Sequence, residues 1–159
     1  MSLALLCPGQ GAQHPAMFDR VRDVAAARPV LEAASAVLGH DVIAAAARDN
    51  RFDNAQAQPL LCAAILAHWQ GLRDALPAPL LVAGYSIGEL AAHSIAGSFD
   101  AGTCLALAVQ RARLMDAASP ADATEPGAAR YKNFLSMFLM YSNIRVSSSL
   151  SIIVELEKG

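Results

Sequence analysis

The sequence contains little charge, and this scarcity excludes several kinds of partner. Only 16% of its 159 residues are Asp, Glu, Lys or Arg, and the formal net charge is -2. No block of like charges occurs, whereas proteins that bind nucleic acids or anionic membranes need a basic surface. We therefore expect no nucleic acid and no membrane as partner, but a small molecule or another protein.

Cysteine is also sparse, and its distribution argues against disulfides. Cys7, Cys62 and Cys104 are odd in number, widely spaced and each part of an apolar segment. This pattern is typical of reduced, buried thiols. The first residues, moreover, lack the positive segment of a signal peptide. We expect a cytoplasmic protein with three thiols in its core.

Motifs for cofactors are absent from the sequence. Gly9 and Gly11 resemble the start of a dinucleotide fingerprint, but the third glycine is missing. No metal-ligand spacing occurs among the four histidines, which are His14, His40, His68 and His93. We expect no bound cofactor and no metal, and we interpret His68 and His93 as structural residues of helices.

The most informative segment is Gly84-Tyr85-Ser86-Ile87-Gly88-Glu89. It joins an apolar run, Leu80 to Ala83, to a helical pattern, Leu90 to Ala96. A Gly-x-Ser-x-Gly element between a strand and a helix is typical of a nucleophile elbow, in which a sharp turn exposes the serine hydroxyl. Developing negative charge there is stabilised by the helix N-terminus. The sequence therefore predicts Ser86 as a nucleophile.

A second glycine-rich segment follows the first apolar run, Leu3 to Cys7. In Pro8-Gly9-Gln10-Gly11-Ala12-Gln13, two glycines flank Gln10. Such a loop can point main-chain N-H groups into one small volume, which suits an oxyanion or a phosphate. A simple turn is the alternative interpretation.

Apolar residues at helical spacing predict helices elsewhere in the chain. Between Met17 and Leu38 we expect two helices separated at Pro29, with a stop at Gly39. Further helices are expected over Val42 to Ala47, Leu60 to Leu76 and Ala101 to Ala117. The alternation of strands and helices predicts an α/β fold, a partial parallel sheet flanked by helices. If its two strands are neighbours, Gln10 and Ser86 lie in the same crevice, at the carboxyl ends of the strands.

The composition changes after Ala118. Residues 119–130 form a Pro- and Ala-rich linker, and residues 131–159 contain no alanine but carry both lysines of the chain. We expect three parts, 1–118, 119–130 and 131–159. The tail is hypothesised to be foreign or out of frame, with a strand over 151–156 that could cover an open sheet edge.

Four motifs in order resemble the N-terminal half of a malonyl-CoA:acyl carrier protein transacylase, over about residues 1 to 118. They are Cys7-Pro8-Gly9-Gln10-Gly11-Ala12-Gln13, Gln58-Pro59, Gly84-Tyr85-Ser86-Ile87-Gly88-Glu89 and Gln110-Arg111-Ala112-Arg113-Leu114-Met115. Tyr85 and the segment Gly11 to Pro15 are more similar to the epsilon subunit of malonate decarboxylase.

The resemblance implies a role for each matched residue. Ser86 would be malonylated, the N-H groups of Gln10 and Ile87 would form the oxyanion hole, and Arg111 would hold the malonyl carboxylate. Gln58 would line the pocket, although a helix cap is an equal alternative. The implied substrates are malonyl-CoA, a coenzyme A thioester, and the thiol of an acyl carrier protein.

In that family the general-base histidine comes from the second half, beyond a ferredoxin-like small subdomain. We therefore expect the acyltransferase large subdomain in truncated form, without the small subdomain, with impaired activity and with self-association through an exposed sheet edge. One alternative is a catalytically inactive fragment or binding module. A serine esterase is a weaker one, because that class needs an Asp or Glu and then a histidine downstream of Ser86. Asp100 and Asp116 are present, but no histidine follows His93.

Overall fold

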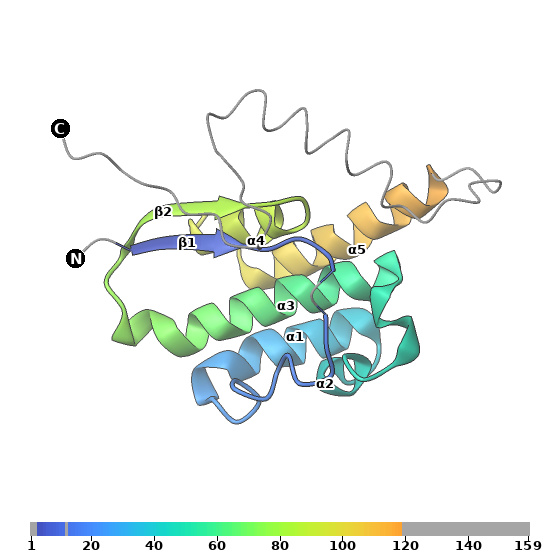
Figure 1. Ribbon diagram of the computed structural model, residues 1–159, viewed down its shortest axis with the longest axis horizontal. Helices are drawn as coiled ribbons and strands as arrows, with labels where there is room; N and C mark the ends of the chain where they lie inside the picture. The colour runs from blue at the N-terminus through green and yellow to red at the C-terminus, as the bar shows by residue number, and fades with distance from the viewer. Residues whose placement is uncertain (1–2, 12, 119–159) are drawn as a thin grey trace. The chain divides into compact units, whose positions relative to one another are not determined.

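Two parallel strands and the helices around them make up the structure (Figure 1). The computed structural model describes residues 3–11 and 13–118. The predicted linker and tail lie outside these residues. The elements in order are β1 (Leu3–Cys7), the 3-10 turn η1 (Ala25–Ala27), α1 (Arg28–Leu38), α2 (Val42–Ala45), η2 (Asp49–Phe52), α3 (Asn54–Leu72), η3 (Arg73–Ala75), β2 (Pro79–Gly84), α4 (Gly88–Ile95) and α5 (Ala101–Ala117). The predicted α/β class is confirmed.

The two strands pair in parallel, which confirms that they are neighbours. Leu5 lies opposite Val82, and Cys7 opposite Gly84. Beyond the ladder, the N-H of Tyr85 donates to the carbonyl of Cys7 at 3.0 Å. The loop after β1 and the turn after β2 therefore start side by side at the same end of the sheet.

Helix α3 is the central element of the core. Its fully buried side chains include Leu60, Cys62, Ala63 and Ala67, and it packs against α1, α4 and α5 (Figure 1). A helix that is apolar on nearly all sides is stable only when it is surrounded by other elements. Because many of its buried residues are alanines, neighbouring helices can approach closely.

The expectation of two helices between Met17 and Leu38 is wrong for the first of them. Residues 15–23 form turns and Ala25–Ala27 a 3-10 turn, and the only α-helix in this range is α1. Phe18 and Val21 are nevertheless buried, so their helical spacing reflects packing onto the core. Pro29 begins a helix instead of separating two, because the first helical turn needs no N-H donor. Gly39 ends α1 with φ 74°, as predicted.

The predicted bounds of α3 are also wrong at both ends. The helix begins at Asn54, so Gln58 and Pro59 lie inside it, and it ends at Leu72, followed by η3. Its N-cap is Asp53, which excludes the alternative role of Gln58 as a cap. Pro59 costs one hydrogen bond to the carbonyl of Ala55, a loss that the surrounding core tolerates.

The expected buried thiols are confirmed, since Cys7, Cys62 and Cys104 are free and buried. Burial raises the pKa of the Cys7 thiol to about 11. A hydrogen bond with the Cys104 thiol, together with burial, raises the pKa of Cys62. A raised pKa leaves little thiolate at neutral pH, so the thiols of Cys7 and Cys62 are poor nucleophiles. In the described part of the chain, no helix is long and apolar enough to cross a membrane.

Candidate active site

Ser86 occupies the sharp turn between β2 and α4. Its φ of 55° is the one positive φ of a non-glycine residue among the described residues. Left-handed backbone is costly for an L-residue and persists only where the surroundings impose it. Ser86 is 9% exposed. A strained serine between a strand and a helix is the geometry of a nucleophile elbow.

The two glycines of the motif permit this turn by close approach. A Cβ on Gly88 would overlap the carbonyl oxygens of Cys7 and Pro8, and a Cβ on Gly84 would overlap the backbone of Gly88 and Glu89. Neither neighbour can yield, because both are backbone. The glycines therefore bring the start of α4 against the end of β1, next to Ser86.

Arg111 of α5 contacts the serine through its guanidinium. Its Nη2 donates to Ser86 Oγ at 3.3 Å, and its Nη1 donates to Gln58 Oε1 at 2.9 Å. The Met115 sulfur accepts from the same Nη1 at 3.0 Å and from Gln58 Nε2 at 3.2 Å. Neither ion pair found within residues 3–11 and 13–118 includes Arg111. Within the described residues, the guanidinium thus contacts neutral acceptors only, in a half-buried position that favours binding an anion.

Gln58, by contrast with Arg111, is completely buried. Its amide oxygen orients the guanidinium, and its amide nitrogen is held by the sulfur of Met115. Three segments that are distant in the sequence, the elbow, α3 and α5, therefore meet at Arg111. The structure brings Ser86, Arg111 and Gln58 into one hydrogen-bonded group.

Ile87 forms the N-cap of α4. The N-H groups of Gly88, Glu89 and Leu90 donate to the carbonyls three residues earlier, whereas the N-H of Ile87 precedes this series. Its carbonyl accepts a long hydrogen bond of 3.8 Å from the Cys62 thiol, and its side chain is fully buried. These contacts hold the residue after the nucleophile against α3.

Gln10 lies in the loop after β1 but makes its side-chain contact elsewhere. Its Nε2 donates to Asn54 Oδ1 at 3.1 Å, and Asn54 Nδ2 donates to Asp116 Oδ1 at 2.6 Å. The motifs do not indicate Asn54 and Asp116, because nothing in the order of residues shows that the start of α3 and this loop meet the end of α5. Within the loop, the N-H of Gly11 donates to Gln13 Oε1 at 2.7 Å.

No histidine among the described residues is hydrogen-bonded to Ser86. His68 Nδ1 lies 2.8 Å from the carbonyl of Ala64, one turn earlier in α3. His93 lies exposed on α4, 3.5 Å from the Ser98 hydroxyl and stacked obliquely near Phe99. Among the described residues, no three His, Cys, Asp or Glu side chains are grouped as metal ligands.

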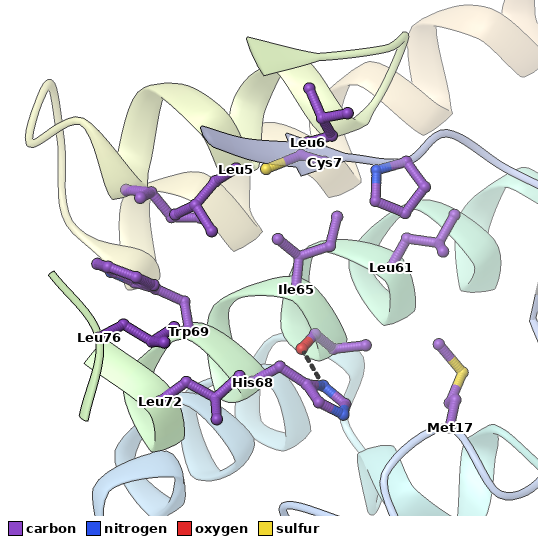
Figure 2. Close-up of a pocket in the computed structure, with 13 residues that line it drawn as sticks. Leu5, Leu6, Cys7, Met17, Leu61, Ile65, His68, Trp69, Leu72 and Leu76 are labelled. Atoms are coloured by element: carbon purple, nitrogen blue, oxygen red, sulfur yellow. Dashed lines mark hydrogen bonds between the residues drawn. The ribbon is translucent and has the colours of Figure 1, made fainter. Parts of the chain in front are cut away.

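A cavity of about 330 Å³ lies between β1 and α3 (Figure 2). Its lining is mostly apolar and comprises Leu5, Leu6, Cys7, Pro8, Met17, Leu61, Ala64, Ile65, His68, Trp69, Leu72, Leu76 and Ile95. Ser86, Arg111 and Gln58 do not line it. The cavity lies beneath β1 and is therefore separate from the candidate site.

The fold and the elbow together define an α/β protein with a serine-centred site. Comparison with known proteins specifies its relatives. The chain is 38% identical over 130 residues to the malonyl CoA-acyl carrier protein transacylase of Mycobacterium tuberculosis H37Rv, covering 78% of this chain and 42% of the relative. No protein-family model matches the chain.

Solved structures agree with this comparison. The malonyl-CoA:ACP transacylase of Synechocystis sp. PCC 6803 superposes with a TM-score of 0.71 and 34% identity, over 75% of this chain and 41% of that one. A malonyl-transacylase solved in complex with a type II PKS acyl-carrier protein has a TM-score of 0.69 and 33% identity, over 76% and 40%. The matched part of the chain belongs to the malonyl-CoA:acyl carrier protein transacylase family. It spans 42% of the length of the M. tuberculosis relative.

Proposed function

We propose that Ser86 accepts a malonyl group from malonyl-CoA and passes it to the thiol of an acyl carrier protein. The observation that carries this proposal is the Arg111 guanidinium, which donates to both Ser86 and Gln58 without a carboxylate partner in the described residues. A planar cation beside a strained serine suits a substrate with a carboxylate next to a reactive carbonyl.

In the first step, Ser86 Oγ attacks the thioester carbonyl. The O-C bond forms, the C-S bond breaks, and coenzyme A leaves as its thiol with the proton that the serine loses. The main-chain N-H groups of Gln10 and Ile87 are proposed to hold the oxyanion. Gln10 follows β1 and Ile87 follows β2, so both residues lie at the same end of the sheet as Ser86. In the second step, the carrier thiol attacks the acyl-serine and releases Ser86.

Arg111 is proposed to select malonyl over acetyl groups. Two N-H donors can grip the terminal carboxylate in a bidentate manner, with Gln58 fixing the plane of the guanidinium. An acetyl group would leave this charge without its partner, and sites built for a polar group reject substrates that lack it.

A serine hydroxyl also needs a base, and no described histidine is hydrogen-bonded to Ser86. The base is proposed to be a histidine that this sequence does not contain, as the resemblance implies, so that this chain alone acylates slowly. The same observation favours a second candidate, a catalytically inactive fragment or binding module. An esterase remains the weakest candidate, since the hydrogen-bond partner of His93 is Ser98 and no histidine follows His93 in the sequence.

The carrier is proposed to be an acyl carrier protein, because one similar structure was solved in complex with one. Tyr85, whose ring lies against Gly9, and the sequence Gly11 to Pro15 support a carrier of the malonate decarboxylase type. The three reduced thiols support a cytoplasmic location. We further propose that the chain self-associates through its sheet, and we expect no cofactor beyond the coenzyme A thioester.

Intact-mass spectrometry after incubation with malonyl-CoA tests the proposed function. We expect a mass increase of one malonyl group, which is absent in Ser86→Ala and reversed by an acyl carrier protein with its thiol arm. Ser94→Ala, a serine of α4 outside the site, is the matched control and keeps the adduct. If the unsubstituted chain forms no adduct at neutral or alkaline pH, the inactive-fragment candidate holds instead.

A further inference from the structure

The hydrogen bonds from Asp116 through Asn54 to Gln10 join three segments around the candidate site. Asn54 is the first residue of α3, and Asp116 lies in the last turn of α5. Gln10 belongs to the loop after β1 that is proposed to supply an oxyanion N-H. The motif comparison in the sequence assigned no role to Asn54 or to Asp116.

The chemistry of the three groups fixes their orientation. A carboxylate only accepts hydrogen bonds, so Asp116 takes the Nδ2 end of Asn54. Asn54 must then turn its oxygen toward the loop, where it accepts from Gln10 Nε2. The amide oxygen of Gln10 consequently faces the other way. It is buried and has no hydrogen-bond partner within the described residues.

A buried acceptor without a donor costs free energy, because it has lost its hydrogen bond to water. Gln10 could avoid this cost by turning its amide over or swinging outward, if the contact with Asn54 did not hold it. The orientation of Gln10 is therefore imposed from outside its own loop. The local bond between Gly11 and Gln13 does not restrain the Gln10 side chain.

We propose that Asn54 is a positioning residue for acylation of Ser86, that it acts by holding Gln10 and its main-chain N-H in place, and that Asp116 orients Asn54. This inference rests on the proposed function. We call Asp116, Asn54 and Gln10 the relay. The loss of either Asn54 or Asp116 would free the side chain of Gln10.

Hydrogen exchange of the loop amides in the full chain tests the relay without requiring activity. We expect Asn54→Ala and the surface variant Asp116→Ala to accelerate amide exchange over residues 9–13 by about fivefold or more. Asp116→Asn should restore slow exchange, because its amide oxygen still accepts from Asn54. Asp23→Ala, an exposed acid outside the relay, is the control. Unchanged exchange in both relay variants, or equal acceleration throughout α3 and α5, would overturn the proposal.

The rate of Ser86 malonylation provides the second readout. At saturating malonyl-CoA, Asn54→Ala should lower the rate constant about tenfold, since a displaced oxyanion donor weakens the transition state. The half-saturating concentration should stay constant, because Arg111 and Gln58 are untouched. The double variant with Asp116→Ala should lose no more than Asn54→Ala alone. Additive losses, or a change confined to half-saturation, would contradict the relay.

The two proposals fail in different ways. Absence of a malonyl adduct in the unsubstituted chain overturns the proposed function, and loop exchange then decides on the relay by itself. A normal adduct with unaltered loop exchange and rate in Asn54→Ala overturns the relay and leaves the proposed function standing.

Discussion

Arg111 and Ser86 are the residues whose individual chemistry matters most. Arg111 Nη2 donates to the serine hydroxyl, so the group proposed to bind the substrate carboxylate also contacts the proposed nucleophile. Its Nη1 lies 2.9 Å from Gln58 Oε1, so the same guanidinium is also anchored on α3. Because Arg111 contacts both of these groups, we expect its replacement to weaken the binding of malonyl-CoA more than it lowers the free energy of unfolding.

We predict that Arg111→Lys raises the half-saturating concentration of malonyl-CoA for adduct formation about tenfold or more, because one ammonium cannot replace two coplanar donors. Adduct formation from acetyl-CoA should change far less. Intact-mass time courses with each thioester measure both effects. Arg113→Ala, an exposed neighbour on α5, serves as the control, and equal losses with both thioesters would refute a carboxylate clamp.

At the scale of the elements, the junction between β1 and α4 determines where the elbow lies. The first residue of α4 is Gly88, and its α-carbon lies so close to the carbonyls of Cys7 and Pro8 that no side chain fits. Gly102, the second residue of α5, has only Asp100 Oδ1 within 4 Å of an added Cβ, at an ordinary 3.5 Å. The two glycines therefore allow a matched comparison.

We predict that Gly88→Ala lowers the free energy of unfolding by at least about 2 kcal/mol, because backbone must move to admit the methyl group. Gly102→Ala should instead be neutral or raise the free energy of unfolding by up to about 1 kcal/mol, since alanine favours a helix. Urea denaturation followed by circular dichroism measures both. Equal stability of the two variants would show that α4 does not rest on β1 as described.

For the molecule as a whole, the sheet presents apolar surface. In the described residues it has two strands, so β1 and β2 each have one edge that no strand pairs there. Leu80 on β2 is 69% exposed, and Leu72 and Leu76, which line the cavity beneath β1, are 51% and 37% exposed. Open edges without charged residues and exposed apolar side chains both favour association.

We predict that the chain associates as its concentration rises, with a mass above 16.6 kDa for a single chain. Leu80→Lys should weaken association, whereas Leu114→Lys should not, because Leu114 is equally exposed at 64% but lies on α5. Size-exclusion chromatography with light scattering measures this. A monodisperse monomer at high concentration would contradict the prediction.

The order of residues was sufficient for the elements with strong local signals. The two apolar runs were recognisable because short apolar segments bounded by Pro and Gly are typical of buried strands. The Gly-x-Ser-x-Gly turn and Gly39 after α1 were recognisable because each depends on backbone geometry that few residues adopt. The region from Met17 to Val24 was misread because burial against a neighbouring element produces the same apolar spacing as a helix. The start of α3 was misread because Pro59 resembles a helix start, whereas packing around α3 keeps it inside the helix.

The sequence by itself determined the α/β class, the buried thiols and Ser86 at the elbow, since these follow from local pattern and composition. Only the tertiary structure decided that Arg111 contacts both Ser86 and Gln58, and that Asp116, Asn54 and Gln10 form one hydrogen-bonded series. The physical reason is that these contacts join residues from separate elements. Their geometry depends on how α3 and α5 pack against the sheet, and no local pattern records that packing.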